Sequence, residues 1–120
     1  MTDKHAARDV VQRYIDCSGA LDADGLARCF DPHAKLCGYL GPKAIVGEAG
    51  IFLADVKRLA GAGTDMTGYR ASIVAFDANG KVANATVSME GFAGARFVDY
   101  LQLMEQDGAW RIVSKTFTTL

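Results

Sequence analysis

Three tight turns divide the second half of the sequence into four extended segments. The turns lie at Asp77-Ala78-Asn79-Gly80, at Gly91-Phe92-Ala93-Gly94 and at Asp107-Gly108. Asn, Asp and Gly tolerate the positive φ angles that β-hairpin turns require. The sequence therefore predicts four hairpin-linked strands, at residues 66–76, 81–92, 95–105 and 110–118, which pair as an antiparallel sheet.

The first half of the sequence has apolar residues at helical spacing. Steps of three and four residues connect Ala6 or Ala7, Val10, Val11, Tyr14 and Cys17. This spacing predicts a helix from a cap at Thr2 or Asp3 to about Ser18, with Gly19 as its C-terminal cap.

Two shorter helices and one short strand are expected next. Asp22 or Asp24 can cap a second helix, which Asp31-Pro32 stops because Pro cannot continue the hydrogen-bond ladder. A strand at residues 33–39 and a loop at residues 38–43 follow. A third helix is expected from Gly47 or Glu48 to Gly61-Ala62-Gly63, with Ile51 or Phe52, Val56 and Leu59 buried.

The order of these elements indicates the fold class. The 120 residues contain no linker, repeat or low-complexity segment, which predicts one domain spanning residues 1–120. Helices followed by consecutive strands predict an α+β fold, with helices packed on one face of a mainly antiparallel sheet.

The segment at residues 97–104 carries one acid on an otherwise apolar strand face. Alternation places Phe97, Asp99, Leu101 and Leu103 on one face, and Val98, Tyr100, Gln102 and Met104 on the other. A carboxylate on an inward face must be paired, hydrogen-bonded, near water or kept neutral by a raised pKa. Asp99 is therefore the residue that best indicates a pocket.

The composition argues against several classes of function. With 13 Lys and Arg against 14 Asp and Glu, the chain has no basic surplus for binding nucleic acid. The sequence has no apolar run long enough to span a membrane, and its first five residues are not signal-like. Cys17, Cys29 and Cys37 are odd in number and lack paired spacing, so we expect reduced thiols in a cytoplasmic protein.

Motifs for metals, cofactors and nucleophiles are missing from the sequence. Its two His residues lie far apart, and the cysteines lack zinc-ligand spacing, so no metal site is expected. There is no Gly-rich phosphate-binding motif, and no cofactor is expected. No activating His stands beside Cys17 or Cys29, which argues against a catalytic thiolate.

Four segments occur in an order typical of one superfamily. They are Arg13-Tyr14-Ile15-Asp16, Cys29-Phe30-Asp31-Pro32-His33-Ala34, Val98-Asp99-Tyr100-Leu101-Gln102-Leu103 and Asp107-Gly108-Ala109-Trp110-Arg111-Ile112-Val113-Ser114-Lys115-Thr116-Phe117. With them the chain resembles the nuclear-transport-factor-2-like superfamily, and within it the putative lumazine-binding and SnoaL-like group. The resemblance implies a curved sheet that forms a cone with an interior pocket.

A partial similarity to ketosteroid isomerase implies roles for two residues. Tyr14 and Asp99 match that enzyme's two oxyanion-binding acids, so they are the candidate catalytic residues. The position that matches its general base is Gly38, flanked by Cys37 and Tyr39, so ketosteroid isomerase activity is not expected.

The implied pocket and the opposite sheet face supply the remaining candidates. The expected ligand-binding residues are Tyr14, His33, Tyr39, Met89, Phe97, Asp99 and Leu101. Each has a plainer interpretation: Tyr14, Tyr39 and Met89 as packing residues, His33 as a surface or capping residue, and Asp99 as a structural acid.

An apolar sheet face usually signals association, so the other face, with Val98, Tyr100, Gln102 and Met104, predicts a homodimer. The closing strand could add either Trp110-Ile112-Ser114-Thr116 or Arg111-Val113-Lys115-Phe117 to this contact.

Three functions remain open. The first is a small-molecule-binding protein whose apolar pocket carries one buried acid and takes an apolar or aromatic ligand. The second is an enzyme of the SnoaL-like cyclase or isomerase type that acts on a carbonyl-bearing ring compound. The third is a dimeric structural or interaction protein without a ligand. Catalysis needs a tuned acid or base with a reachable partner. The sequence offers few such groups, and this shortage favours binding.

Overall fold

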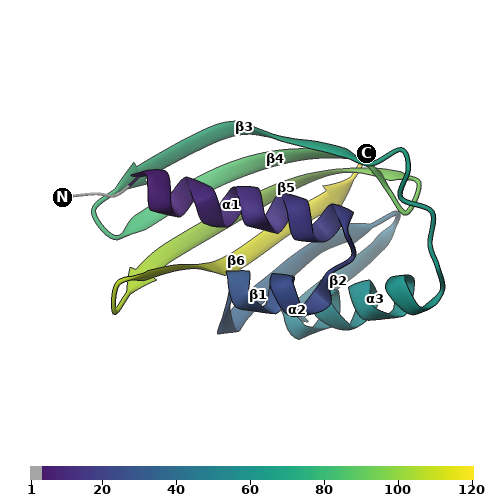
Figure 1. Cartoon of the computed structure of the whole chain (residues 1–120), viewed down its shortest axis with the longest axis horizontal. Coiled ribbons are helices and arrows are strands. Elements are labelled where there is room, and N and C mark those ends of the chain that lie inside the picture. Colours follow the sequence, from purple (N-terminus) through teal and green to yellow (C-terminus); the bar gives the residue numbers. More distant parts are fainter. Residues whose placement is uncertain (1–3) are drawn as a thin grey trace.

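The computed structural model describes residues 4–120 and contains three helices and six strands (Figure 1). The helices are α1 (Lys4–Gly19), α2 (Ala23–Cys29) and α3 (Gly50–Gly61). The strands are β1 (Phe30–Leu40), β2 (Lys43–Glu48), β3 (Arg70–Asn79), β4 (Val82–Phe92), β5 (Ala95–Gln106) and β6 (Ala109–Thr119). The fold is α+β, as the order of the sequence patterns predicts.

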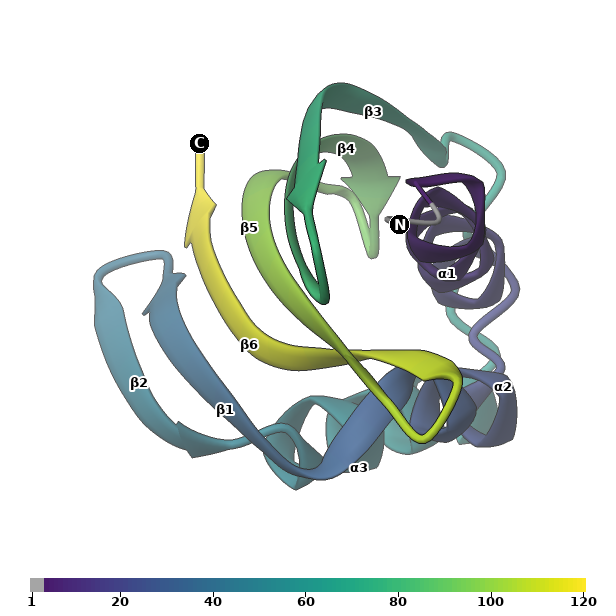
Figure 2. The ribbon, with the colours of Figure 1, turned by 90° about the vertical axis from the view of Figure 1, so that its left-hand side faces the viewer.

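All six strands form one curved sheet in the order β2-β1-β6-β5-β4-β3. Every neighbouring pair is antiparallel except β1 and β6, which are parallel. The sheet bends around the helices, with α1 on its inner side and α2 and α3 beside β1 and β6 (Figure 2). The core lies between the helices and the inner face of the sheet.

The three predicted hairpins are confirmed, and their turns are short. Asn79 pairs with Val82, so Gly80, at φ 56°, begins a two-residue turn. Ala93 and Gly94 form the second turn with both φ angles positive, and Asp107 and Gly108 form the third in the same way. Two successive positive φ angles match the right-handed twist of the flanking strands, which fixes the register of the meander.

Helix α1 buries the face that its periodicity predicts. Ala7, Val10, Val11 and Tyr14 are buried as predicted, and Ile15 is buried beside them, whereas Cys17 is only half-buried. The expected caps Thr2 and Asp3 lie outside the described residues. Gly19 is the last helical residue rather than the left-handed cap, because the left-handed residue is Leu21, at φ 50°. A side chain at Gly19 would collide with the Tyr69 ring, whose hydroxyl donates to the Ile15 carbonyl at 2.6 Å.

Helix α2 is capped by the first of the two expected Asp residues. The Asp22 side chain accepts a hydrogen bond from the Gly25 backbone N–H at 2.9 Å. The helix ends at Cys29, just before Asp31-Pro32, as predicted.

The expected loop at residues 38–43 and the expected start of the third helix are wrong. Strand β1 runs on to Leu40, and β2 returns from Lys43 to Glu48 along its edge. Gly41, at φ 58°, makes the turn between them. Helix α3 therefore begins only at Gly50. Strand β3 also starts later than predicted, at Arg70, because a turn closed by the Tyr69 N–H and the Met66 carbonyl precedes it.

A bulge in β6 changes which side chains face inward. Gln102 pairs with Ser114 and Leu103 with Ile112, which leaves Val113 as the extra residue. Before the bulge, Trp110 and Ile112 are buried; after it, Lys115 and Phe117 are buried. Neither of the two expected faces of the closing strand is therefore continuous, because the bulge shifts the alternation by one residue.

Helix α3 packs against α2 and makes few close backbone approaches to any strand. Its apolar side chains Val56 and Leu59 are buried, whereas Phe52 reaches into the space between the helix and the sheet. That space is where the candidate site lies. Within residues 4–120, no helix is long and apolar enough to cross a membrane.

Candidate functional site

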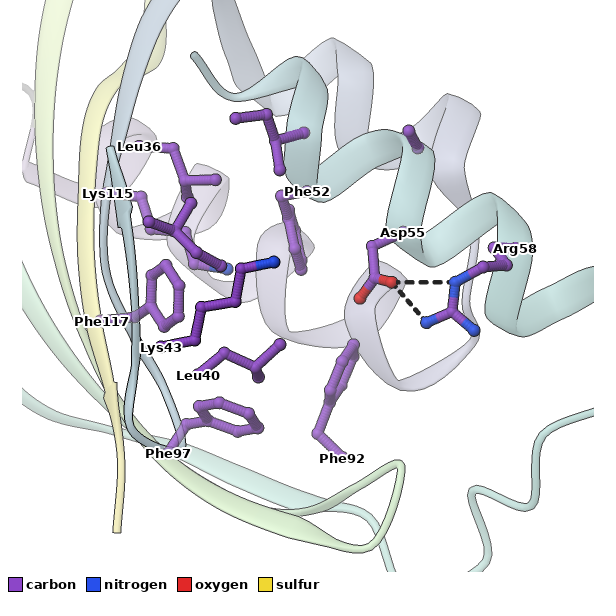
Figure 3. A pocket seen from close by; sticks show the side chains of 13 residues that line it. Leu36, Leu40, Lys43, Phe52, Asp55, Arg58, Phe92, Phe97, Lys115 and Phe117 are labelled. Atoms are coloured by element: carbon purple, nitrogen blue, oxygen red, sulfur yellow. Dashed lines mark hydrogen bonds and ion pairs between the residues drawn. The ribbon is translucent and has the colours of Figure 1, made fainter. Parts of the chain in front are cut away.

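A cavity of about 380 Å³ opens between α3 and the inner face of the sheet (Figure 3). We call it the helix–sheet cavity. Its aromatic walls are Phe52 of α3, Phe92 of β4, Phe97 of β5 and Phe117 of β6. Its aliphatic lining comes from Leu36, Leu40, Ile45, Ile51 and Ala54. A space of this size and apolarity suits a small ring compound.

The four Phe rings that line the cavity form a continuous series. Phe52 lies 6.3 Å from Phe92, Phe92 lies 6.1 Å from Phe97, and Phe97 lies 6.3 Å from Phe117, measured between ring centroids. These separations fall within the range in which aromatic rings attract one another. The rings therefore support one another along the cavity wall and offer flat faces to a planar ligand.

Four polar side chains also line the helix–sheet cavity, and three of them carry positive charge at neutral pH. Lys115 is buried with 5% exposure, whereas Lys43 and Arg58 are exposed. Arg58 binds the carboxylate of Asp55, with its Nη2 2.5 Å from Asp55 Oδ1. Both lysine side chains extend from the sheet toward α3 (Figure 3). This arrangement favours an anionic or carbonyl-bearing ligand over a cationic one.

The Lys115 amine is enclosed by aromatic rings and one carboxylate. Its Nζ lies 3.3 Å from the Phe52 ring centroid, 5.2 Å from that of Tyr14 and 5.5 Å from that of Phe117. Its ionic partner is Asp99, whose Oδ2 is 3.9 Å away. Ring faces attract a cation and the carboxylate balances its charge, which makes burial of the amine tolerable.

Tyr14 and Asp99 form a buried pair behind Lys115. The Tyr14 hydroxyl donates to Asp99 Oδ2 at 2.5 Å, and Tyr14 and Asp99 are 0% and 2% exposed. This same oxygen faces Lys115. The three side chains, one each from α1, β5 and β6, therefore form a single polar cluster within the apolar core, and only Lys115 lines the cavity.

Burial shifts the pKa values of this cluster. Loss of hydration lowers the pKa of Lys115 from 10.5 to about 8, although Asp99 and, to a smaller extent, Asp55 oppose the shift. Burial, followed by the charge of Asp99 and its hydrogen bond, raises the pKa of Tyr14 well above its usual value. Near neutral pH the phenol therefore keeps its proton, while part of the lysine amine is neutral.

The structure brings together some of the candidate residues and separates others. Tyr14 meets Asp99, and Phe97 lines the helix–sheet cavity. Met89 and Leu101 also face inward, but both pack in the hydrophobic core and neither lines the cavity.

The candidates His33 and Tyr39 lie elsewhere. His33 is exposed beside Asp31, whose carboxylate accepts its backbone N–H. Tyr39 is 54% exposed and lines a groove on the outer face of the sheet.

Gly38 leaves no room for the catalytic base that ketosteroid isomerase carries at the matching position. A Cβ added at Gly38 would lie 2.1 Å from the Phe117 carbonyl oxygen and 2.6 Å from Cδ1 of its ring. The aromatic wall of the cavity thus occupies the place of that side chain. Within residues 4–120, the one carboxylate that lines the cavity is Asp55, which enters from α3 and is already bound to Arg58.

The sequence patterns did not identify Lys115, Phe52, Phe92 or Phe117 as site residues. A signal for Lys115 exists in retrospect: Trp110, Ile112 and Phe117 cannot share one face of a regular strand, since Phe117 comes five positions after Ile112 and an odd step changes the face. A bulge that buries all three also turns Lys115 inward. Among residues 4–120, no group of His, Cys, Asp or Glu is arranged to hold a metal ion.

Residues 2–118 match a family model described as putative lumazine-binding. A comparison with curated proteins found no match. Solved structures with the same fold include an NTF2-like protein of unknown function from Silicibacter pomeroyi DSS-3, which is 28% identical with a TM-score of 0.84 and full coverage of both chains.

Two other solved structures are more distant in sequence. An NTF2-like protein of unknown function from Methylobacillus flagellatus KT is 24% identical, with a TM-score of 0.85 over 98% of this chain and 92% of that one. A ketosteroid isomerase-like protein from Erwinia carotovora atroseptica SCRI1043 is 16% identical, with a TM-score of 0.71 over 98% and 96%. These two similarities concern the fold alone.

Proposed function

We propose that this chain, which belongs to the putative lumazine-binding family of nuclear-transport-factor-2-like folds, binds a small planar ring compound in its helix–sheet cavity. The observation that supports this proposal most directly is an apolar cavity of about 380 Å³ with aromatic walls and one buried amine. A flat ring would stack on Phe52 and Phe92, and a carbonyl or carboxylate oxygen would face Lys115. Lumazine, a bicyclic dione, has this general shape and chemistry.

Binding accounts for the cavity better than isomerase-type catalysis does. The pair of acids, Tyr14 and Asp99, does not line the cavity, and the position of a base is Gly38, packed against Phe117. An acid pair outside the cavity lining and the absence of a base at position 38 argue against proton transfer of the ketosteroid isomerase type. The polar groups that do line the cavity are Lys115, Lys43 and the Asp55–Arg58 pair.

The proposal can be tested with ring probes and a variant that fills the cavity. 2-Naphthoate and lumazine are each expected to raise the midpoint of thermal unfolding, which corresponds to about 2.7 kcal/mol at a concentration of 100 times Kd. In Ala54→Trp the indole is expected to enter the cavity and abolish this stabilisation, because Ala54 is exposed on α3 and lines the cavity.

Ala60→Trp is the matched control for that test. Ala60 is exposed on the same helix but does not line the cavity, so this variant should keep the response to both probes. If neither probe stabilises the wild-type protein at millimolar concentration, or if both Trp variants respond equally, the proposed cavity function is wrong.

We also propose that the outer sheet face joins two copies of the chain. Tyr39, Val46 and Tyr100 are 54%, 83% and 46% exposed there and line one shallow groove with Thr116 and Thr118. Val98, Gln102 and Met104 continue this face along β5. An apolar sheet surface of this kind favours association over exposure to water.

Light scattering after size-exclusion chromatography tests the dimer. The wild-type protein is expected to have twice the mass of one chain at micromolar concentration, and Val46→Lys combined with Tyr100→Glu is expected to give single chains. Val74→Lys, at an exposed position on the opposite edge strand β3, should leave the dimer intact. A wild-type protein that elutes with the mass of one chain would contradict this proposal.

A further inference from the structure

Lys115 is an unusual residue to place at a binding surface. Exposed lysines at the cavity mouth would attract an anion at little cost, and Lys43 already lies there. Lys115 instead is 5% exposed, so its amine has lost nearly all of its hydration. Burying an ammonium group is costly even when it is paired. Attraction of a ligand's charge is therefore a poor explanation for Lys115.

The surroundings of Lys115 hold its amine at one place in the cavity wall. Phe52, Tyr14 and Phe117 approach its Nζ from three elements, and Asp99 approaches it from a fourth. Phe52 and Phe117 also line the helix–sheet cavity. A ligand ring that lies against these two rings is consequently brought next to the lysine nitrogen.

A lysine in an apolar site is the usual form of an amine nucleophile. Only the neutral amine has a lone pair available to attack carbon, and desolvation favours the neutral form. With a pKa of about 8, about a tenth of the Lys115 amine is neutral at pH 7. A lysine with the ordinary pKa would be neutral to less than about a thousandth at that pH.

We propose that the Lys115 amine forms a reversible imine with an aldehyde or ketone group of the molecule that enters the helix–sheet cavity. This inference rests on the proposed function. A bond forms between Lys115 Nζ and the carbonyl carbon, and the carbonyl oxygen leaves as water with two protons from the ammonium group. A protonated imine remains, so the positive charge is conserved and no oxidant or reductant is needed.

Asp99 and Tyr14 act here as positioning residues. Asp99 faces the nitrogen at 3.9 Å before the reaction and would balance the charge of the protonated imine after it. The Tyr14 hydroxyl fixes the carboxylate through the 2.5 Å hydrogen bond. The other charged groups around the cavity are Asp55 and Arg58 of α3 and Lys43 of β2. Asp99 and Asp55 favour the ammonium form of Lys115, whereas burial opposes it.

Reductive trapping with 2-naphthaldehyde tests the imine. The wild-type protein is incubated with this aldehyde and sodium cyanoborohydride, and the labelled lysine is located by peptide mass spectrometry. We expect label on Lys115 in at least tenfold excess over each of the five other lysines, all of which are exposed. Excess 2-naphthoate, which has the same rings but forms no imine, should suppress the label on Lys115 alone.

Two variants complete this test. Lys43→Met should keep the label on Lys115, and Lys115→Met should lose it while the exposed lysines react as before. In Asp99→Asn, loss of the negative charge should move the pH profile of Lys115 labelling to lower pH and raise its rate at pH 6 severalfold. A residue with only a structural role would not shift that profile.

The outcomes separate this inference from the proposed function. If 2-naphthoate stabilises the protein but cyanoborohydride leaves Lys115 unlabelled, the imine is wrong and non-covalent binding stands. The same conclusion follows if the label is spread evenly over the lysines. If neither 2-naphthoate nor lumazine gives stabilisation, the proposed function itself is wrong.

Discussion

Asp99→Ala is expected to lower the free energy of unfolding by about 3–5 kcal/mol, the usual cost of removing one member of a buried ionic pair. The change leaves the Tyr14 hydroxyl without its acceptor and the Lys115 amine without its carboxylate, and both are buried. Phe52 and Phe117 lie against the amine, and Tyr14 is 0% exposed, so both groups stay largely out of water. Urea unfolding at pH 7, followed by far-UV circular dichroism, measures the loss.

Asp99→Asn is the control for that measurement. Its amide oxygen can still accept the Tyr14 hydrogen bond, so the expected loss is smaller, about 1 kcal/mol. A variant that replaces the whole cluster with apolar side chains, Tyr14→Phe with Asp99→Leu and Lys115→Met, is expected to recover most of the stability lost in Asp99→Ala. If Asp99→Ala unfolds at the wild-type urea midpoint, the three side chains do not form an energetically coupled cluster.

Gly38→Ala is expected to lower the free energy of unfolding by about 3 kcal/mol, near the upper end of the range for overpacked interiors. The added methyl group would lie 2.1 Å from the Phe117 carbonyl oxygen. A backbone oxygen cannot rotate away, so β1 and β6 would have to separate at the one parallel pair of the sheet. Because Phe117 also lines the helix–sheet cavity, the variant should lose the response to 2-naphthoate as well.

Gly47→Ala provides a matched comparison on the neighbouring strand. Its added methyl group would lie 2.5 Å from Cδ1 of Ile51, the flexible end of a half-exposed side chain that can move aside. We expect a loss of less than about 1 kcal/mol for this variant. Equal losses for the two Ala variants would show that contact with Phe117 does not determine the choice of glycine at position 38.

The sequence predicted the meander of four strands because its turns contain residues that adopt positive φ angles. Asp107-Gly108 is the clearest case, since both residues occupy that region in the structure. The inward orientation of Asp99 followed from simple alternation along β5, where Phe97, Leu101 and Leu103 are buried beside it. These features depend on local backbone geometry, which can be predicted from neighbouring residues in the sequence.

Other features depend on contacts between distant segments. The edge strand β2 was missed because Lys43–Glu48 is short and its pairing with β1 is tertiary. Lys115 was missed because the bulge at Val113 reverses the alternation of β6. By contrast, simple alternation along β1 is enough to place Tyr39 on the outer face, opposite to the cavity-lining Leu36 and Leu40. Phe97 and Leu101 lie on the same face of β5, yet Phe97 lines the cavity and Leu101 is packed in the core. No sequence rule distinguishes these two positions.

The parallel pairing of β1 with β6 has a consequence for the order in which the molecule can be assembled. The hairpin of β1 and β2 joins the rest of the sheet only through the pairing of β1 with β6, residues 109–119. The paired residues are about 80 positions apart in the chain. Contacts so distant in sequence close late and slowly. While the chain emerges from the ribosome, the hairpin of β1 and β2 must wait with an unpaired edge. The helix–sheet cavity is complete only after Lys115 and Phe117 have been synthesised and β6 has paired with β1.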